Sequence, residues 1–174
     1  MAIMKSKVFL LSFALWTVPF LLRLSVYIDP VANDKIGTNT NSVVERVVKS
    51  IDNSDNTTTF SLIFENNIKG CFLNVFGGVL LSDGTVVNLM FNGFAAADVF
   101  RSSYDAGFPL TSILKTTLPH SFELVGFWLS GAIGFMITWQ FVRFMRGKEA
   151  FSRLILKQIG LLLCVMTVLI LGAA

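Results

Sequence analysis

The sequence predicts an all-α protein: a transmembrane helical bundle of about five spans with its N-terminus in the cytoplasm. Apolar residues make up 53% of the 174-residue chain and charged residues only 14%, against roughly 45–50% and about 25% in soluble domains. The mean hydropathy is +0.68. A soluble domain of this composition could not cover its surface with polar groups, and 17 phenylalanines exclude a disordered chain.

The first apolar block covers residues 8–28, VFLLSFALWTVPFLLRLSVYI. At about 1.5 Å per residue it reaches across the roughly 30 Å of a bilayer core. Pro19 should kink this helix, and Arg23 can extend its charge toward the interface. A cleaved signal peptide is the alternative, because Lys5 and Lys7 precede an apolar stretch. The length of the block, its arginine and the absence of a small-residue cleavage site favour a retained helix.

Four further apolar segments complete a single membrane domain, and we predict spans at residues 62–81, 85–104, 120–142 and 154–172. The sequence Ser-Asp-Gly at 82–84 predicts a tight turn between the second and third spans. Residues 105–119, with Gly107 and two prolines, predict a loop before the fourth span. Residues 29–59 hold five acidic and three basic side chains and predict a loop outside the cytoplasm.

Loop charge sets the orientation, because cytoplasmic loops of membrane proteins are enriched in Lys and Arg. With the N-terminus in the cytoplasm, seven basic residues share the cytoplasmic side: Lys5, Lys7, Arg143, Arg146, Lys148, Arg153 and Lys157. The acidic 29–59 loop then lies outside. These basic residues form no water-facing stripe, so the net charge of +3 does not predict a nucleic-acid partner.

Small and amide side chains recur at spacings of three and four in the second to fourth segments. Small residues let helices approach closely in a membrane, and amides bond across the contact. We therefore predict that these three segments pack through Gly70, Asn74, Gly77, Gly78, Asn88, Asn92, Gly93, Gly126, Ser130 and Gly134. A polar pathway for an ion, proton or peptide between the same helices is the alternative interpretation.

Other polar residues near the outer ends of these segments predict an intramembrane polar cluster of Asn66, Asn67, Asp98, His120 and Glu123. His120 and Glu123 are three positions apart and share a helix face. Because lipid cannot satisfy their polar groups, we expect Asn67, His120 and Glu123 to bond to one another. A ligand-contacting or proton-linked role is the alternative. Zinc needs three or four ligands, so no metal site is predicted, and no catalytic or cofactor motif is recognisable.

Three segments, FSLIFENNIKGCFLNVFGGVLL, NLMFNGFAAADVF and LPHSFELVGFWLSGAIGF, resemble in this order the stage II sporulation protein M family of bacterial membrane proteins. The likeness covers about residues 60–145. Its matching positions are Phe60, Asn66, Asn67, Gly77, Gly78, Asn92, Gly93, His120, Glu123 and Leu124. Ser121 departs from the family pattern, which usually has Gly after the His.

The resemblance implies a non-enzymatic, multi-pass protein of the bacterial cytoplasmic membrane. In this family the namesake recruits cell-wall-degrading partners during sporulation, and other members accompany ABC transporters in bacteriocin production and immunity. The expected role is thus a scaffold or accessory subunit. Its expected partners are the lipid bilayer and cell-wall hydrolases or ABC transporter subunits, without cofactor, metal or nucleic acid. A transport protein with a polar site between the second, third and fourth spans is the alternative.

Overall fold

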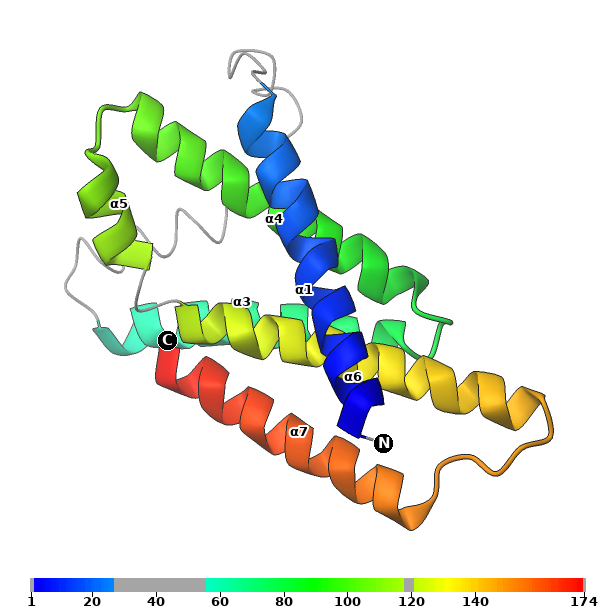
Figure 1. Ribbon diagram of the computed structural model, residues 1–174. Helices are drawn as coiled ribbons and strands as arrows, with labels where there is room; N and C mark the ends of the chain where they lie inside the picture. Colours follow the sequence, from blue (N-terminus) through cyan, green and yellow to red (C-terminus); the bar gives the residue numbers. More distant parts are fainter. Residues whose placement is uncertain (1, 27–55, 118–120, 174) are drawn as a thin grey trace.

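The computed structural model describes residues 2–26, 56–117 and 121–173. Within these ranges the ordered elements are all helices (Figure 1): α1 (Ala2–Ser25), α3 (Asn56–Gly77), α4 (Asp83–Asp105), α5 (Leu110–Thr117), α6 (Ser121–Met145) and α7 (Arg153–Ala173). The predicted all-α class is confirmed. By length and composition, three of these helices could cross a membrane: Ser6–Ser25 in α1, Phe122–Met145 in α6 and Arg153–Gly172 in α7.

The helices α3 and α4 are long enough to span a bilayer but more polar than the other three. They contain 22 and 23 residues, which at about 1.5 Å each correspond to roughly 33 Å. Each carries charged and amide side chains that lower its hydropathy: Glu65, Asn66, Asn67, Lys69 and Asn74 in α3, and Asp83, Asn88, Asn92, Asp98, Arg101 and Asp105 in α4. The partners of these polar groups therefore decide how the two helices sit in the molecule.

The turn between α3 and α4 lies earlier than the sequence predicts. Helix α3 ends at Gly77, and Leu81 and Ser82 adopt left-handed backbone angles, φ 55° and 74°. Asp83 and Gly84 already belong to α4, so the prediction of a Ser-Asp-Gly turn was wrong. Its glycine serves a contact instead, because a Cβ on Gly84 would lie 3.2 Å from the Cα of Gly77.

Two predicted loops contain helix. Residues 105–119 were expected to be irregular, yet α5 occupies Leu110–Thr117. Its apolar positions Leu110, Ile113 and Leu114 have helical spacing, and the backbone N–H of Ile113 bonds the carbonyl of Pro109 over 3.2 Å. The predicted loop 29–59 falls mostly outside the described residues, and its last four positions belong to α3.

Contacts between α3, α4 and α6 fix their relative directions. Gly77 of α3 faces Thr85 of α4, while Gly70 O accepts a bond from the later residue Asn88, so α3 and α4 are antiparallel. Along α6 the order is the same as along α3: Gly70 faces Phe127 and Gly78 faces Gly134. Helices α3 and α6 therefore run in the same direction.

The remaining long helices run in the opposite direction to α3 and α6. In α1, Trp16 contacts Gly93 and Arg23 contacts Asp98, so α1 is parallel to α4. Phe151, just before α7, packs edge-on against Phe141 near the end of α6, and Ile170 near the end of α7 faces Gly126. Helix α7 is therefore antiparallel to α6, and α1, α4 and α7 share one direction.

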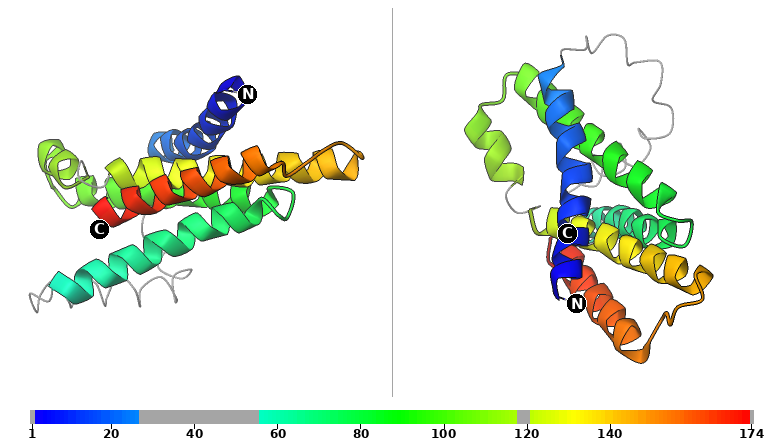
Figure 2. Two further views of the ribbon diagram at one scale, coloured as in Figure 1. Left: turned by 90° about the horizontal axis from the view of Figure 1, so that it is seen from below. Right: turned by 45° about the vertical axis from the view of Figure 1, so that its right-hand side comes forward.

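The helices form three layers. Figure 2 shows α1 and α3 on opposite sides of a layer that contains α4, α6 and α7. In Figure 1, α4 and α6 approach each other near the α3–α4 turn and diverge toward their other ends, and α1 crosses both. The buried core draws on all five long helices, α1, α3, α4, α6 and α7, and consists of Trp16, Cys71, Leu89, Phe127, Ile133, Met166 and Ile170.

Candidate functional site

Three glycines bring α3, α4 and α6 into backbone contact. A Cβ on Gly77 or on Gly134 would lie 2.8 Å from Oγ1 of Thr85, and a Cβ on Gly78 would overlap the backbone of Gly134. Real Cβ contacts are essentially never closer than 3.0 Å. Only glycine therefore fits these positions without a shift of the helices, which is the close approach that small residues allow in membranes.

The other predicted packing glycines contact different partners. Gly70 faces the ring of Phe127 in α6: a Cβ on Gly70 would lie 3.2 Å from Cε2 of Phe127. Gly93 lies against the backbone of Trp16 in α1. A Cβ on Gly126 would lie 2.9 Å from Cδ1 of Ile170 in α7. Both glycines were predicted as helix-packing positions, and the structure places Gly93 against α1 and Gly126 against α7.

Four polar side chains form a directed series of hydrogen bonds across α4, α3 and α6, which we call the amide chain: Asn92, Asn88, Asn74 and Ser130. Asn92 Nδ2 donates to Asn88 Oδ1 over 3.0 Å, and Asn88 Nδ2 donates to Asn74 Oδ1 over 2.8 Å. Asn74 Nδ2 donates to Ser130 Oγ over 2.9 Å, and Ser130 Oγ donates to the carbonyl of Phe127 over 2.6 Å. Each group thus meets the polar partner that lipid cannot supply.

Backbone carbonyls tie the amide chain to the helices around it. Thr85 Oγ1 donates to the carbonyl of Asn74 over 2.7 Å, and Asn88 Nδ2 also donates to the carbonyl of Gly70 over 2.9 Å. Asn74, Thr85 and Ser130 are fully buried. A buried and bonded network of this kind fixes the relative rotation of the three helices, because a rotated helix would leave amides without partners.

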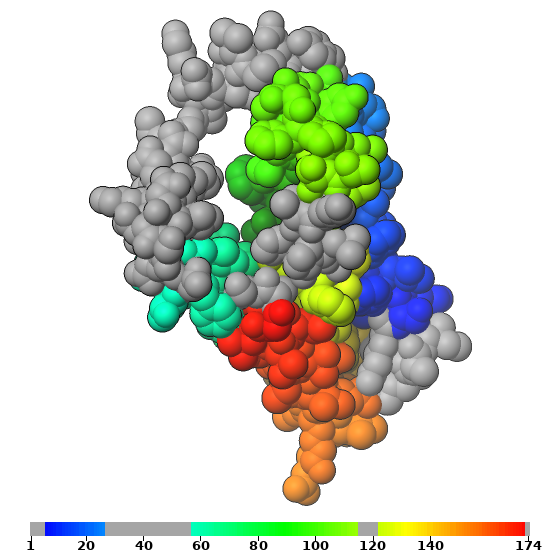
Figure 3. Space-filling view, turned by 90° about the vertical axis from the view of Figure 1, so that its left-hand side faces the viewer, coloured from blue at the N-terminus to red at the C-terminus, as the bar shows by residue number. Residues whose placement is uncertain are grey.

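A cavity of about 570 Å³ adjoins the amide chain where α4 and α6 diverge. Its walls come from all six helices of the described residues, and Figure 3 shows the end of the molecule on which α5, the start of α3 and the end of α7 lie. Aromatic residues supply much of the apolar lining: Trp16, Phe20, Phe100 and Phe127. Its polar lining comprises Asn66, Asn67, Asn92, Ser103 and Glu123. An apolar cavity with a few convergent polar groups is the usual form of a small-molecule or peptide site.

The structure brings together Asn66, Asn67 and Glu123 of the predicted polar cluster, since all three line the cavity. Asn66 Nδ2 lies 3.5 Å from Asn67 Oδ1, while Asn67 Nδ2 is buried without a hydrogen-bond partner among the described residues. His120 lies outside the described residues, so its predicted bonds stay a prediction. Asn67 therefore offers an amide donor at the cavity wall.

Asp98, the fifth member of the predicted cluster, is not among the cavity residues and contacts α1 instead. Its Oδ1 lies 2.6 Å from Nε of Arg23. Next to this pair, Arg101 Nη1 donates to the carbonyl of Leu24 over 3.1 Å. These contacts arise because α1 packs along α4, and they give the charge of Arg23 a partner within the protein.

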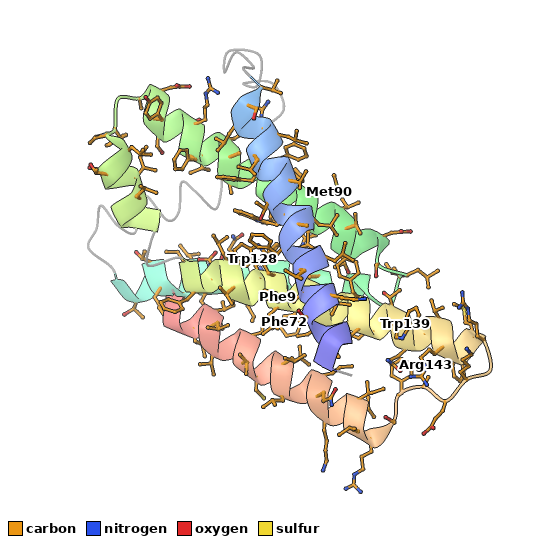
Figure 4. All side chains as sticks on the ribbon, viewed as in Figure 1. Phe9, Phe72, Met90, Trp128, Trp139 and Arg143 are labelled. Carbon is orange, nitrogen blue, oxygen red and sulfur yellow. The ribbon has the colours of Figure 1, made fainter. Side chains whose placement is uncertain are left out.

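Sequence reasoning assigned no partner to α1, although its contacts are extensive. Ser12 is fully buried and donates to the carbonyl of Trp128 over 2.7 Å. The Trp128 ring meets Trp16 at 5.7 Å between centroids, and Figure 4 shows Trp128 where α1 crosses α6. Gly131 makes room for this crossing, because a Cβ there would overlap Oγ of Ser12 in α1. A lone serine in the apolar run FLLSFAL was the signal that could have revealed this helix contact.

No group of three or more His, Cys, Asp or Glu residues is arranged to hold a metal ion within the described part of the chain. Both cysteines are free: Cys71 is buried and Cys164 is exposed. The chemistry offered by the described site is hydrogen bonding from amides, together with one carboxylate and apolar contact.

Comparison with known proteins gives one family and one distant relative. The family model described as stage II sporulation protein M matches residues 6–174. An uncharacterized protein of Methanocaldococcus jannaschii is 32% identical over 91 residues, which are 52% of this chain and 51% of that protein. The chain thus spans about half the length of this relative. No solved structure matches. Because the family model covers nearly the whole chain, this protein belongs to the stage II sporulation protein M family.

Proposed function

We propose that this protein is a multi-pass protein of the bacterial cytoplasmic membrane that works as a scaffold or accessory subunit of a larger complex, without catalysis of its own. Membership of the stage II sporulation protein M family supports a membrane role. Cell-wall hydrolases or ABC transporter subunits are the partner classes that the family resemblance implies.

The proposal includes five spans, α1, α3, α4, α6 and α7, with the N-terminus in the cytoplasm. Their alternating directions support it, because α1, α4 and α7 run opposite to α3 and α6. The polarity of α3 and α4 is compatible with a bilayer, since Asn74 and Asn88 bond inside the bundle. The basic residues Arg143, Arg146 and Lys148 then face the cytoplasm, as the charge rule requires.

The observation that carries the scaffold role is the contrast between the two ends of the bundle. At one end, glycines and the amide chain hold α3, α4 and α6 together. At the other end, the helices diverge around the cavity of about 570 Å³. A firmly packed base can hold such an opening in a constant shape, so that a partner's apolar segment is received at low entropic cost.

Photo-crosslinking tests this role. The photoreactive residue replaces Val99, which lines the cavity and is 69% exposed, or Val87, which is 67% exposed on the same helix and does not line it. In intact cells the Val99 variant should crosslink to a wall hydrolase or an ABC transporter subunit, and the Val87 variant should not. Equal yields from both positions, or adducts with lipid alone, would contradict a partner-binding cavity.

A transport role is the second candidate, and Asn92 favours it. Asn92 lines the cavity and also begins the amide chain, so polar groups continue from the cavity into the bundle. If Glu123 carries a proton or a charge in transport, Glu123→Gln should abolish substrate-linked flux in proteoliposomes. If its role is structural, the same variant should retain function, since a glutamine amide can still form hydrogen bonds.

A further inference from the structure

The connector between α6 and α7 surrounds a second hollow, which we call the basic cleft: Trp139, Val142, Arg143, Arg146 and Lys148. It has a volume of about 260 Å³. Figure 4 shows Trp139 and Arg143 on the last part of α6, next to the connector. Three cations and a tryptophan thus converge on a small space at the end of the bundle that also holds the start of α7.

The three cations of the basic cleft are not engaged in ion pairs within the described residues. The ion pairs of the described residues lie outside the cleft and are Arg23–Asp98, Lys69–Glu65 and Arg101–Asp105. The one acid of the connector, Glu149, joins none of them. The charges of the basic cleft are therefore available to an external anion.

Capping of α6 does not account for these side chains. A helix end often recruits cations to its free carbonyls, but here backbone N–H groups perform that task. Gly147, with φ 67°, turns the chain so that its N–H bonds the carbonyl of Phe144 over 2.9 Å. The N–H of Lys148 bonds the carbonyl of Arg143 over 3.0 Å. The guanidinium and ammonium groups are thus left for another partner.

We propose that the basic cleft binds the phosphate headgroup of an anionic phospholipid. Guanidinium groups such as those of Arg143 and Arg146 match phosphate oxygens in a bidentate geometry. A volume of about 260 Å³ equals that of roughly nine water molecules, enough for a headgroup but not for two acyl chains. The chains lie outside, against apolar surface that includes Trp139, 46% exposed, and Phe144, 67% exposed.

A lipid fits this surface better than a soluble anion because charge and apolar area occur together. Tryptophan is enriched where a protein meets the membrane interface, and basic clusters beside membrane helices attract anionic lipids. The proposal rests on α6 crossing the bilayer, as proposed above. Reporter fusions measure that topology independently, so failure of one proposal can be told from failure of the other.

Lipid titration of the purified full-length protein in neutral detergent, read by native mass spectrometry, tests the site. Phosphatidylglycerol should bind about tenfold more tightly than phosphatidylcholine. The double variant Arg143→Gln/Arg146→Gln should lose this preference. The matched control Arg153→Gln/Lys157→Gln removes two charges near the start of α7 but outside the cleft, and should keep it.

Two further measurements distinguish a lipid headgroup site from diffuse charge attraction and from a soluble-anion site. The thermal stability of the cleft variant without added lipid should equal that of the parent protein, because backbone bonds close α6. Inorganic phosphate at the same concentration should not displace phosphatidylglycerol. Equal loss of preference in both double variants would show diffuse surface attraction and overturn the proposal. Displacement by inorganic phosphate would assign the cleft to a soluble anion and would overturn it as well.

Discussion

At the scale of single residues, the amide chain shows how polar groups can stabilise a bundle in lipid. Asn74 donates to Ser130 and accepts from Asn88, so one side chain joins helices α3, α4 and α6. Ser103, by contrast, donates to the carbonyl of Val99 within its own helix and bonds no other helix among the described residues. Bonds between helices should contribute to the stability of the bundle, while bonds within a helix should contribute little to it.

This difference predicts the effect of two alanine substitutions. Asn74→Ala removes the interhelical bonds to Ser130 and from Asn88, each worth about 0.6–1.7 kcal/mol in membrane proteins, and a longer one of 3.5 Å to the carbonyl of Phe127. The variant should lower the free energy of unfolding by about 1–3 kcal/mol. The loss is limited because Asn88 and Ser130 keep backbone acceptors. Ser103→Ala should change stability by less than about 0.5 kcal/mol. Reversible unfolding in mixed detergent micelles measures both, and equal stabilities would mean that the amide chain does not hold the helices together.

At the scale of helices, contacts form where a residue without a side chain faces another backbone. Gly134 faces the carbonyl of Asn74 and the side chain of Thr85, and Gly77 faces the backbone of Gly84 and Thr85. In α7, Gly160 has open space where a Cβ would be. The same residue type therefore has a packing role in α3 and α6 and none at this position of α7.

Leucine substitutions should separate these cases. Gly134→Leu and Gly77→Leu should each push helices apart and destabilise the protein by about 1–3 kcal/mol or more, the usual cost of inserting side-chain atoms into a packed contact. Gly160→Leu provides the matched control and should leave the melting temperature in detergent within the error of the parent value. Melting temperatures of Gly134→Leu and Gly77→Leu that match the control would contradict the close approach of α3, α4 and α6.

The same helices show what could be predicted from sequence and what could not. The five apolar segments and the small faces of the second to fourth segments are periodic patterns within single helices, which a sequence displays directly. The partners of Gly93 and Gly126 depend on where α1 and α7 pack, which no local pattern encodes. Asp98 illustrates this limit, because its partner Arg23 is 75 positions away in the chain.

At the scale of the whole molecule, helix direction and charge point to the same arrangement. Helices α1, α4 and α7 run opposite to α3 and α6, and the order of directions alternates along the chain. In the proposed five-span topology, an alternation of this kind places the starts of α1, α4 and α7 and the ends of α3 and α6 on one side of the bilayer. Lys7, Arg143, Arg146, Lys148 and Arg153 gather on that side.

Reporter fusions test this topology. Because positive loops stay in the cytoplasm, a fluorescent reporter fused after Lys148 should be active, and an alkaline phosphatase fused there should be inactive. The same phosphatase fused within residues 53–59, after one span, should be active, since it folds only after export. As a control, Arg143→Glu/Arg146→Glu/Lys148→Glu should reduce the cytoplasmic signal after Lys148 if loop charge sets orientation.

A phosphatase active after Lys148 and inactive at 53–59 would require an inverted bundle. Equal activity at both sites would place them on the same side of the membrane. The proposed topology forbids this, because an odd number of spans lies between the two sites. Either result would therefore contradict five alternating spans with a cytoplasmic N-terminus.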